Sequence, residues 1–296
     1  MRSLPVFSDL RAFLAHAEAA GDLARVAAPV DLRHEMTAVQ LAALRAGGPI
    51  LRFDAATSDG KRAAMPVVAN LFGTPARVAA GLGLQLDEVP AFGDFLAALR
   101  SPAPVEGMRD ALSRWPVLRA ALQGRPKLLR HAVAQEQSAP LDLSLVPVQT
   151  PWPGDAGPLV TWPVVVTRPH GSEAGQVARY NLGVYRAQVL GPDRLILRWL
   201  AHRGGAAHHR GWLRANEPMP VAIALGADPA TLLSAALPLP ETVSEMAFSG
   251  VLRGARAEIV PARTVPLLVP ANAEIILEGW VHPGETAPEG PFGDHT

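Results

Sequence analysis

The chain has 296 residues, enough for about two domains, and 49% of them are hydrophobic, which is sufficient for a sizeable core. Lys plus Arg and Asp plus Glu number 27 each, so the formal net charge is zero and no basic excess indicates nucleic acid as a partner. The absence of cysteine excludes disulfides, thiolate nucleophiles and Cys-ligated metal sites. No signal peptide or long apolar run is recognisable, so we expect a cytoplasmic protein without a membrane span.

Helical and strand patterns alternate over the first 125 residues, which is typical of an α/β domain. Ser8 is expected to cap a helix that ends at Gly21, and a second helix is expected over Glu35–Ala46. Short strands are predicted at Ile50–Phe53 and Met65–Ala69. Further helices are predicted at Pro75–Gly81, Phe92–Arg100 and Met108–Leu122. A domain boundary is predicted after residue 125, which divides the chain into 1–125 and 126–296.

Short β runs separated by turn signals follow from residue 126 on, and they predict an antiparallel barrel or sandwich. The runs are Val160–Thr167, Val221–Leu225, Ala247–Arg253, Ala257–Val260, Val265–Val269 and Glu274–Trp280. One helix is predicted after Asp228, because Pro229 then stands at the first helical position. No GxGxxG, Walker A or GxSxG motif is present, so dinucleotide-binding, P-loop and serine-hydrolase interpretations lose support.

Residues 181–205 have the pattern of a β-hairpin, with apolar runs on either side of the turn residues Gly191-Pro192-Asp193. Donor and cationic side chains accompany these runs at Asn181, Arg186, Arg198, His202 and Arg203. Burying so many of them is costly unless an anion or a metal satisfies them. The set, closed by two glycines, suits a phosphate with a bound cation. An ordinary hairpin with a solvated basic face is the alternative.

The segments Asn181–Arg186 and Arg198–Gly205 resemble the flavin-binding hairpin of the UbiD-type decarboxylases. Further segments resemble the same family in the same order: Leu44–Pro49, Asn70–Pro75, Trp152–Pro153 with Pro158–Trp162, Ala224–Thr231, Ser244–Phe248 and Glu285–Asp294. Within the family, the His202-Arg-Gly-Gly segment and the ending at Asp294 are most similar to the 4-hydroxy-3-polyprenylbenzoate decarboxylases of ubiquinone synthesis.

The resemblance implies an α+β fold in which an N-terminal α/β domain, residues 1–125, precedes a split β-barrel flavin-binding domain, residues 126–296. It implies prenylated FMN as cofactor, supplied by a partner flavin prenyltransferase, with Mn²⁺ and usually K⁺ at the flavin phosphate. The family's C-terminal α/β domain, which contributes to a homo-oligomer, is expected to be absent from this sequence. The chain would then be a fragment or a short relative.

The resemblance also assigns three sets of site residues. The metal ligands are Asn181, His202 and Glu245, whose oxygen and imidazole donors suit manganese or magnesium. The flavin-contacting residues are Val184, Tyr185, Arg186, Arg198, Trp199, Leu200, Arg203 and Gly204. The catalytic network is Arg186, Glu289 and Asp294, with Asp294 as the proton donor. Plain core packing of Trp199 and Leu200, and an acidic surface loop at the chain end, are the alternatives from the residues themselves.

The implied activity is that of a carboxy-lyase, the non-oxidative decarboxylation of 4-hydroxy-3-polyprenylbenzoate to 2-polyprenylphenol in ubiquinone biosynthesis. The alternatives are decarboxylation of a smaller aryl or acrylic acid, and a fragment that binds cofactor without turning over. A polyprenyl tail requires a pocket that opens to the surface and an enzyme that works at the inner face of the cell membrane. The zero net charge predicts a weak attachment through the tail.

Overall fold

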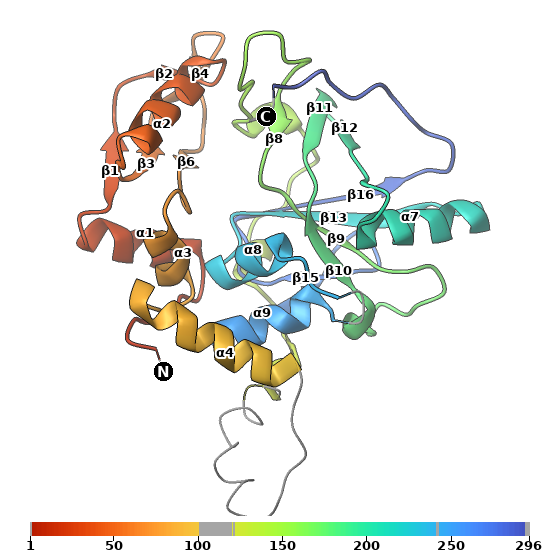
Figure 1. Ribbon diagram of the computed structural model, residues 1–296. Helices are drawn as coiled ribbons and strands as arrows, with labels where there is room; N and C mark the ends of the chain where they lie inside the picture. The colour runs from red at the N-terminus through yellow and green to blue at the C-terminus, as the bar shows by residue number, and fades with distance from the viewer. Residues whose placement is uncertain (1, 101–119, 121, 241–242, 294–296) are drawn as a thin grey trace, which may run out of the picture.

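The computed structural model describes residues 2–100, 120, 122–240 and 243–293, which form an α+β structure (Figure 1). The helix expected over Met108–Leu122 lies largely outside the described residues. Helices and strands of the first hundred residues gather on one side, and most of the later strands on the other. Among the helices in the described ranges, none combines the length and the apolarity needed to cross a bilayer.

The N-terminal region is built on two small sheets. In the first, β1 (Leu23–Val26) pairs in parallel with β3 (Ile50–Phe53), which pairs antiparallel with β6 (Val67–Ala69). The second contains β2 (Val30–Asp31), β4 (Ala56–Ser58) and β5 (Lys61–Arg62). The helices are α1 (Leu10–Ala19), α2 (Glu35–Arg45), α3 (Pro75–Gly81) and α4 (Val89–Arg100), with a 3₁₀ turn at Leu86–Glu88.

The start of α1 differs from expectation, because Asp9 and not Ser8 is the N-cap. The Asp9 carboxylate accepts a hydrogen bond from the backbone N–H of Ala12 at 2.8 Å. The Ser8 hydroxyl instead donates to Asp9 at 2.7 Å. A carboxylate one residue later competes successfully for the free N–H groups of the first turn, since it also carries the charge that the helix dipole favours.

A four-stranded sheet in the order β10-β9-β13-β16 forms the centre of the second half. Its strands are β9 (Val164–Thr167), β10 (Asn181–Val184), β13 (Met219–Leu225) and β16 (Ile275–Val281). Side chains alternate across β13, so Val221 and Ile223 pack into one hydrophobic cluster while Ala222 and Ala224 pack into another. The sheet is therefore covered on both faces, which explains why β13 reads as a continuous apolar run.

Two three-stranded sheets complete the barrel region. One contains β8 (Leu159–Val160), β11 (Ala187–Gly191) and β12 (Arg194–Leu197), and the other β7 (Lys127–Leu128), β14 (Glu258–Pro261) and β15 (Leu268–Pro270). Short 3₁₀ turns occur at Val133–Gln135, Leu143–Leu145 and Val177–Arg179, and the helices are α7 (Gly204–Ala215), α8 (Pro229–Ala236) and α9 (Glu245–Arg253). Asp228 caps α8 as predicted, accepting from the N–H groups of Ala230 and Thr231 at 3.1 and 3.2 Å.

The expected hairpin is present only in its second part. β11 and β12 pair with each other, whereas β10 pairs with β9 in the four-stranded sheet. The chain changes sheets at Tyr185 and Arg186, where the Tyr185 ring packs so closely against Gly183 and Gly205 that a Cβ on either glycine would collide with it. The prediction that Gly204-Gly205 close the hairpin is wrong as well, because these glycines begin α7.

The run Ala247–Arg253, predicted as a strand, is the helix α9. Ser244 stands at its N-cap position and Gly254, with φ +73°, ends it in the left-handed conformation. A Cβ on Gly250 would lie 2.3 Å from the Gln123 carbonyl oxygen, so the glycine that weakens the helical pattern is required by close packing. Burial of Met246 and Leu252 supplies the apolar side of the helix.

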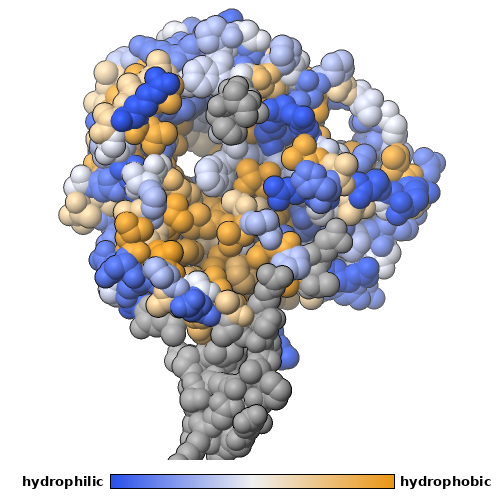
Figure 2. Space-filling model, viewed as in Figure 1, coloured by the Kyte–Doolittle hydropathy of each residue, from blue (hydrophilic) through white to orange (hydrophobic). Residues whose placement is uncertain are grey.

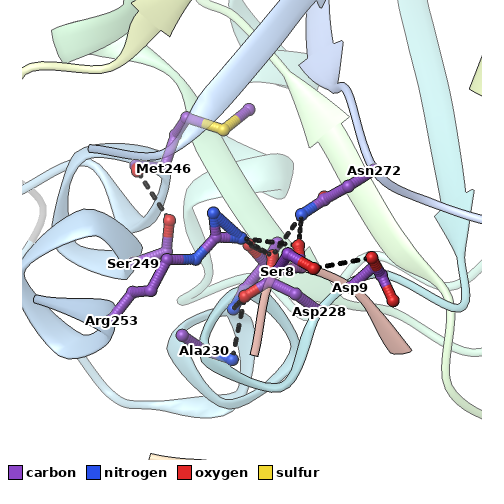
Figure 3. A network of polar contacts seen from close by, with 9 residues as sticks. Ser8, Asp9, Asp228, Ala230, Met246, Ser249, Arg253 and Asn272 are labelled. Atoms are coloured by element: carbon purple, nitrogen blue, oxygen red, sulfur yellow. Dashed lines mark hydrogen bonds and ion pairs between the residues drawn. The ribbon is translucent and has the colours of Figure 1, made fainter. Parts of the chain in front are cut away.

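Buried polar contacts join α8 and α9 to the N-terminal segment (Figure 3). The guanidinium of Arg253 lies 2.8 Å from the Asp228 carboxylate, and the two side chains are 8% and 2% exposed. Arg253 also donates to the carbonyl oxygen of Ser8 at 3.3 Å, and Asn272 donates to the same carbonyl. The elements that flank the barrel are thereby fixed to the chain start.

Apolar packing joins the same regions. Figure 2 shows hydrophobic residues gathering on the face that carries α3, α8 and α9. A Cβ on Gly81, at the end of α3, would lie 3.0 Å from the Phe72 ring and 3.1 Å from Pro229 at the start of α8. The Phe72 ring also lies 5.7 Å from Trp162, between centroids. These contacts set the N-terminal helices against the helices that border the candidate site.

Candidate functional site

A cavity of about 510 Å³ lies where β10, the start of α7 and the segment between α8 and α9 meet. We call it the β10 cavity. Its volume is within the range of small-molecule and cofactor sites, ~300–1,000 Å³. The expected metal ligands Asn181, His202 and Glu245 all line it, although they are up to 64 positions apart in the sequence. The fold therefore brings these three residues to one place.

Asn181 is the first residue of β10, and its side chain is buried. A Cβ on Gly204 would lie 2.2 Å from Asn181 Oδ1, so only glycine permits this close approach of α7 to the amide. The Asn181 Nδ2 atom donates to the Tyr185 hydroxyl at 3.3 Å. The amide is thus held between β10 and the first turn of α7.

Tyr185 is a supporting residue beneath this amide. Its hydroxyl accepts a hydrogen bond from the backbone N–H of Gly205 at 2.9 Å. Burial raises the pKa of Tyr185, so the phenol stays neutral and remains available as a donor to Asn181 Oδ1, at 3.4 Å. The ring meets Trp199 edge to face, with centroids 5.1 Å apart. Tyr185 therefore links Asn181, a candidate metal ligand, to Trp199, another of the candidate flavin-contacting residues.

Glu245 begins α9 and turns its carboxylate toward β10. One carboxylate oxygen accepts a hydrogen bond from the backbone N–H of Leu182 at 3.0 Å. Burial raises the pKa of Glu245, and this hydrogen bond opposes the shift only in part. A cation in the cavity would favour the charged carboxylate and reverse the shift.

His202 and Arg203 are exposed and line the cavity from the turn that precedes α7. In the part of the chain that the structure describes, no group of three His, Cys, Asp or Glu side chains is close enough to hold a metal ion. A cation at His202 and Glu245 would accordingly need the Asn181 amide and oxygens of a bound ligand to complete its coordination. That donor set suits a hard or borderline cation such as Mn²⁺ or Mg²⁺.

Arg186 and Glu289 form a second feature beside the cavity. Arg186 Nε and Nη2 donate to the two carboxylate oxygens of Glu289 at 2.6 and 2.9 Å, a bidentate pair whose side chains are 27% and 16% exposed. The arginine lies over the Phe292 ring, 5.4 Å from its centroid. The C-terminal segment passes over β11 and β12 at this point (Figure 1), and Gln188 accepts the N–H of Gly290 at 2.9 Å. Asp294 lies outside the described residues.

The expected flavin-contacting residues divide between several places. Val184, Tyr185, Arg203 and Gly204 line the β10 cavity. Trp199 lines a second cavity of about 780 Å³, between β12, β13 and β16. Arg186, Arg198 and Leu200 are not among the described residues that line either cavity. Arg198 adjoins Arg186, since its backbone N–H donates to the Arg186 carbonyl oxygen at 3.5 Å.

Sequence reasoning missed two residues that line the β10 cavity, Arg179 and His208. His208 Nδ1 lies 2.9 Å from the hydroxyl oxygen of Thr167, at the end of β9. Burial, together with the positive charge of Arg179, lowers the pKa of His208 to about 4. No local signal distinguishes either residue, and the helix that carries His208, α7, was not predicted because two glycines open it.

Two family models match the chain. The model of the 3-octaprenyl-4-hydroxybenzoate carboxy-lyase Rift-related domain, UbiD, matches residues 126–296, which is more than half of the chain. The chain belongs to the UbiD family. The model of the N-terminal domain of the same carboxy-lyases matches residues 14–96. The expected UbiD fold, an N-terminal α/β region followed by a split barrel, is thereby confirmed.

Solved structures similar to this UbiD chain include two at 26–30% identity. Vanillic acid decarboxylase of Sedimentibacter hydroxybenzoicus, closed form, is 26% identical with a TM-score of 0.80, and the match covers 98% of this chain and 58% of that one. The UbiD-class enzyme HmfF from Pelotomaculum thermopropionicum, in complex with FMN, is 30% identical with a TM-score of 0.78, covering 97% and 58%. The chain thus spans 58% of the length of these two relatives.

A third solved structure supports the fold. Apo 3,4-dihydroxybenzoic acid decarboxylase (AroY) of Klebsiella pneumoniae is 22% identical with a TM-score of 0.72, and the match covers 94% of this chain and 55% of that one. HmfF has also been solved in an evolved dimeric form in complex with prFMN.

Proposed function

We propose that this chain carries the cofactor-binding part of a UbiD-class decarboxylase that acts on an aryl acid. The observation that supports this most is the β10 cavity, which brings Asn181, His202 and Glu245 together in a member of the UbiD family. Relatives 26–30% identical over nearly the whole chain are a vanillic acid decarboxylase and an enzyme solved with FMN. The enzyme class is thus that of the carboxy-lyases.

The residues of the cavity fit prenylated FMN with a divalent cation. Asn181, His202 and Glu245 would hold Mn²⁺ at the flavin phosphate, with K⁺ nearby, and Arg203 and the Gly204 backbone would contact the phosphate end. When bound, prenylated FMN supplies an electron sink for the carbon that loses the carboxylate. Val184 and Tyr185 would border the ring system, and Arg198, Trp199 and Leu200 its outer side.

Arg186 and Glu289 are proposed as the residues that handle the substrate carboxylate and its proton. Arg186 presents the planar fork that binds a carboxylate through two hydrogen bonds, and Glu289 occupies this fork in the present arrangement. A substrate carboxylate would compete for the same donors, and displacement of Glu289 would free it to exchange a proton with Asp294. Asp294 is proposed to give that proton to the carbon from which CO₂ has left.

A small aryl acid is the substrate class that the relatives favour over the polyprenylated acid expected from the sequence. The first solved relative is a vanillic acid decarboxylase, and AroY, similar at the level of fold, is named for another small hydroxybenzoic acid. The polyprenylbenzoate of ubiquinone synthesis stays a second candidate, because the family model is named for 3-octaprenyl-4-hydroxybenzoate. In that case we propose a cytoplasmic enzyme that contacts the inner membrane face through the substrate tail.

Co-expression with a flavin prenyltransferase tests the function. The chain should then retain prenylated FMN and release CO₂ from vanillate or 4-hydroxybenzoate faster than from a 3-polyprenylated 4-hydroxybenzoate. Faster release from the polyprenylated acid would reverse the order of the two candidates. Retention of the cofactor without release from any of these acids would identify the chain as a cofactor-binding part without turnover. Failure to bind flavin at all would contradict the proposal.

A further inference from the structure

Thr167, which is buried, and His208, which is half-buried, form a polar pair at the wall of the β10 cavity. Thr167 is fully buried at the end of β9, and it stands directly opposite Asn181 in the antiparallel register of β9 and β10. His208 lies on the second turn of α7 and lines the cavity, with its Nδ1 atom 2.9 Å from Thr167 Oγ1. The pair therefore adjoins the amide that is the first of the candidate metal ligands.

The environment of Thr167 determines the tautomer of His208. Across the described ranges, the hydroxyl of Thr167 has His208 Nδ1 as its hydrogen-bond partner and no other. If the proton were on Nδ1, the buried hydroxyl hydrogen would have no acceptor, which is costly. The hydroxyl therefore donates to Nδ1, and the neutral imidazole carries its proton on Nε2.

The Nε2 atom of His208 is neither hydrogen-bonded to the described residues nor enclosed by them. No side chain or backbone group of the described residues accepts a hydrogen bond from Nε2. Among these residues, Ser244 Oγ is an enclosed polar side-chain atom without a partner, and His208 Nε2 is not such an atom. An atom that is neither paired nor enclosed is reached by solvent or ligand. Since His208 lines the β10 cavity, this is the space into which Nε2–H can donate.

The charges around Nε2 favour an anion. Arg179 lines the same cavity from the 3₁₀ turn before β10, and Arg203 lines it from the turn before α7. Neither guanidinium forms an ion pair with a carboxylate in the part of the chain that the structure describes. Among the lining residues that the structure describes, two cationic groups and one neutral N–H donor thus share the cavity with one carboxylate, that of Glu245.

We propose that His208, held by Thr167 as the Nε2–H tautomer, donates a hydrogen bond to a phosphate monoester bound in the β10 cavity, and that Arg179 supplies charge to the same phosphate. This inference rests on the proposed function and extends it, since the phosphate would be that of the flavin. A neutral donor serves better here than a charged one, because it does not repel a cation at Asn181, His202 and Glu245.

The test compares FMN with riboflavin, which lacks the phosphate, by quenching of flavin fluorescence in the presence of Mn²⁺. For His208→Ala we expect FMN binding to weaken about 10- to 100-fold, the value of one hydrogen bond to a charged group, with riboflavin affinity unchanged. His208→Gln retains an N–H donor and should keep most of the preference for FMN. Thr167→Val should lose part of the preference, whereas Thr167→Ser should retain it.

His209→Ala is the matched control. His209 is the next residue on α7, but it lines the second cavity and stacks on Trp199, so the ratio of FMN to riboflavin affinity should stay at the parent value. Titration with inorganic phosphate, followed by ³¹P NMR, separates a site for free phosphate from one that needs the flavin. Stronger binding of free phosphate than of FMN would identify the ligand as phosphate itself and overturn the assignment to the flavin.

The outcomes are distinct. A parent that binds FMN while His208→Ala and His208→Gln keep the parent ratio would overturn this inference and leave the proposed function standing. Equal losses of FMN and riboflavin in His208→Ala would show a structural role and overturn it as well. A parent that binds neither flavin would contradict both proposals. Nitrogen-15 NMR of the His208 ring should show the proton on Nε2, and a proton on Nδ1 would refute the tautomer.

Discussion

His208 is a half-buried base at the wall of the β10 cavity, and its protonation gives a pH dependence at the scale of one residue. Burial lowers its pKa from the ordinary ~6.5 to about 4. Between these two values the unfolded chain binds a proton that the folded chain does not. The free energy of unfolding should therefore be at its full value above pH ~6.5 and fall by about 3 kcal/mol as the pH drops to ~4.

Chemical unfolding between pH 4 and 7 measures this contribution. His208→Gln should flatten the dependence over that window, whereas His131→Gln, at an exposed position, should leave the slope at the parent value. A slope that is the same in the parent and in His208→Gln would show that another group is responsible.

Arg186 supports a second prediction at this scale. Arg186→Lys retains the charge but loses the planar fork that holds Glu289, so we expect turnover of the aryl acid to fall about 10²-fold while FMN affinity is unchanged. Arg194→Lys is the control, because Arg194 pairs with Glu285 at 3.6 Å and both side chains are exposed. Equal turnover in the two variants would contradict the role of Arg186.

The motifs predicted site residues that the fold brings together. Asn181, His202 and Glu245 line one cavity, and Arg186 pairs with Glu289. Their roles as metal ligands and as a catalytic network stay predictions. Arg179 and His208 were not predicted, because nothing local distinguishes them from the other arginines and histidines. Their importance comes from a cavity formed by elements that lie far apart in the sequence.

At the scale of the element, the expected strands β13, β14 and β16 are present within about two residues, whereas α7 and α9 were missed. Glycines explain both errors. α7 begins with Gly204 and Gly205 because the side chains of Asn181 and Tyr185 leave no room for a Cβ there. Gly250 lies in α9 close to the Gln123 carbonyl oxygen, which also leaves no room for a Cβ. Each glycine lowers the helix propensity of its segment, and the tertiary contact that requires it is invisible in the local pattern.

The hairpin shows a related limit. An apolar run from Leu182 to Leu190 predicts a strand, but it does not say that the run belongs to two sheets. The division at Tyr185 depends on the fit of its ring against two glycines and on a hydrogen bond from Gly205. A single long strand and two short ones have the same periodicity, so only the packing decides between them.

The buried pair of α8 and α9 gives a prediction for element stability. Asp228→Asn leaves the Arg253 guanidinium buried without its carboxylate, so the free energy of unfolding should fall by about 3–5 kcal/mol. Glu18→Gln breaks an equally short pair, with Arg25 at 2.7 Å, but both side chains are about half exposed. That change should cost about 0–1 kcal/mol.

Urea unfolding of the two variants makes the comparison. A loss for Asp228→Asn as small as that for Glu18→Gln would show that the Arg253–Asp228 pair in Figure 3 does not hold α8 and α9 together.

At the scale of the whole molecule, the β10 cavity exists because three parts of the chain meet. The four-stranded sheet supplies Asn181, the turn before α7 supplies His202, and α9 supplies Glu245. The hydrogen bond from Arg253 to the Ser8 carbonyl oxygen and the packing around Phe72 hold α8 and α9 in position from the N-terminal side. Binding in the cavity should accordingly depend on residues from all three parts.

The dependence of FMN binding on metal tests this account most directly. We expect removal of Mn²⁺ by a chelator to weaken FMN binding to the parent at least about tenfold, because under the proposal Asn181, His202 and Glu245 would hold the cation at the flavin phosphate. Glu245→Gln should bind FMN as the chelated parent does and should show no further effect of the chelator. Glu285→Gln, at an exposed position, should behave as the parent. Equal FMN affinity of the parent with and without metal, or full metal dependence in Glu245→Gln, would contradict the assignment of the cavity.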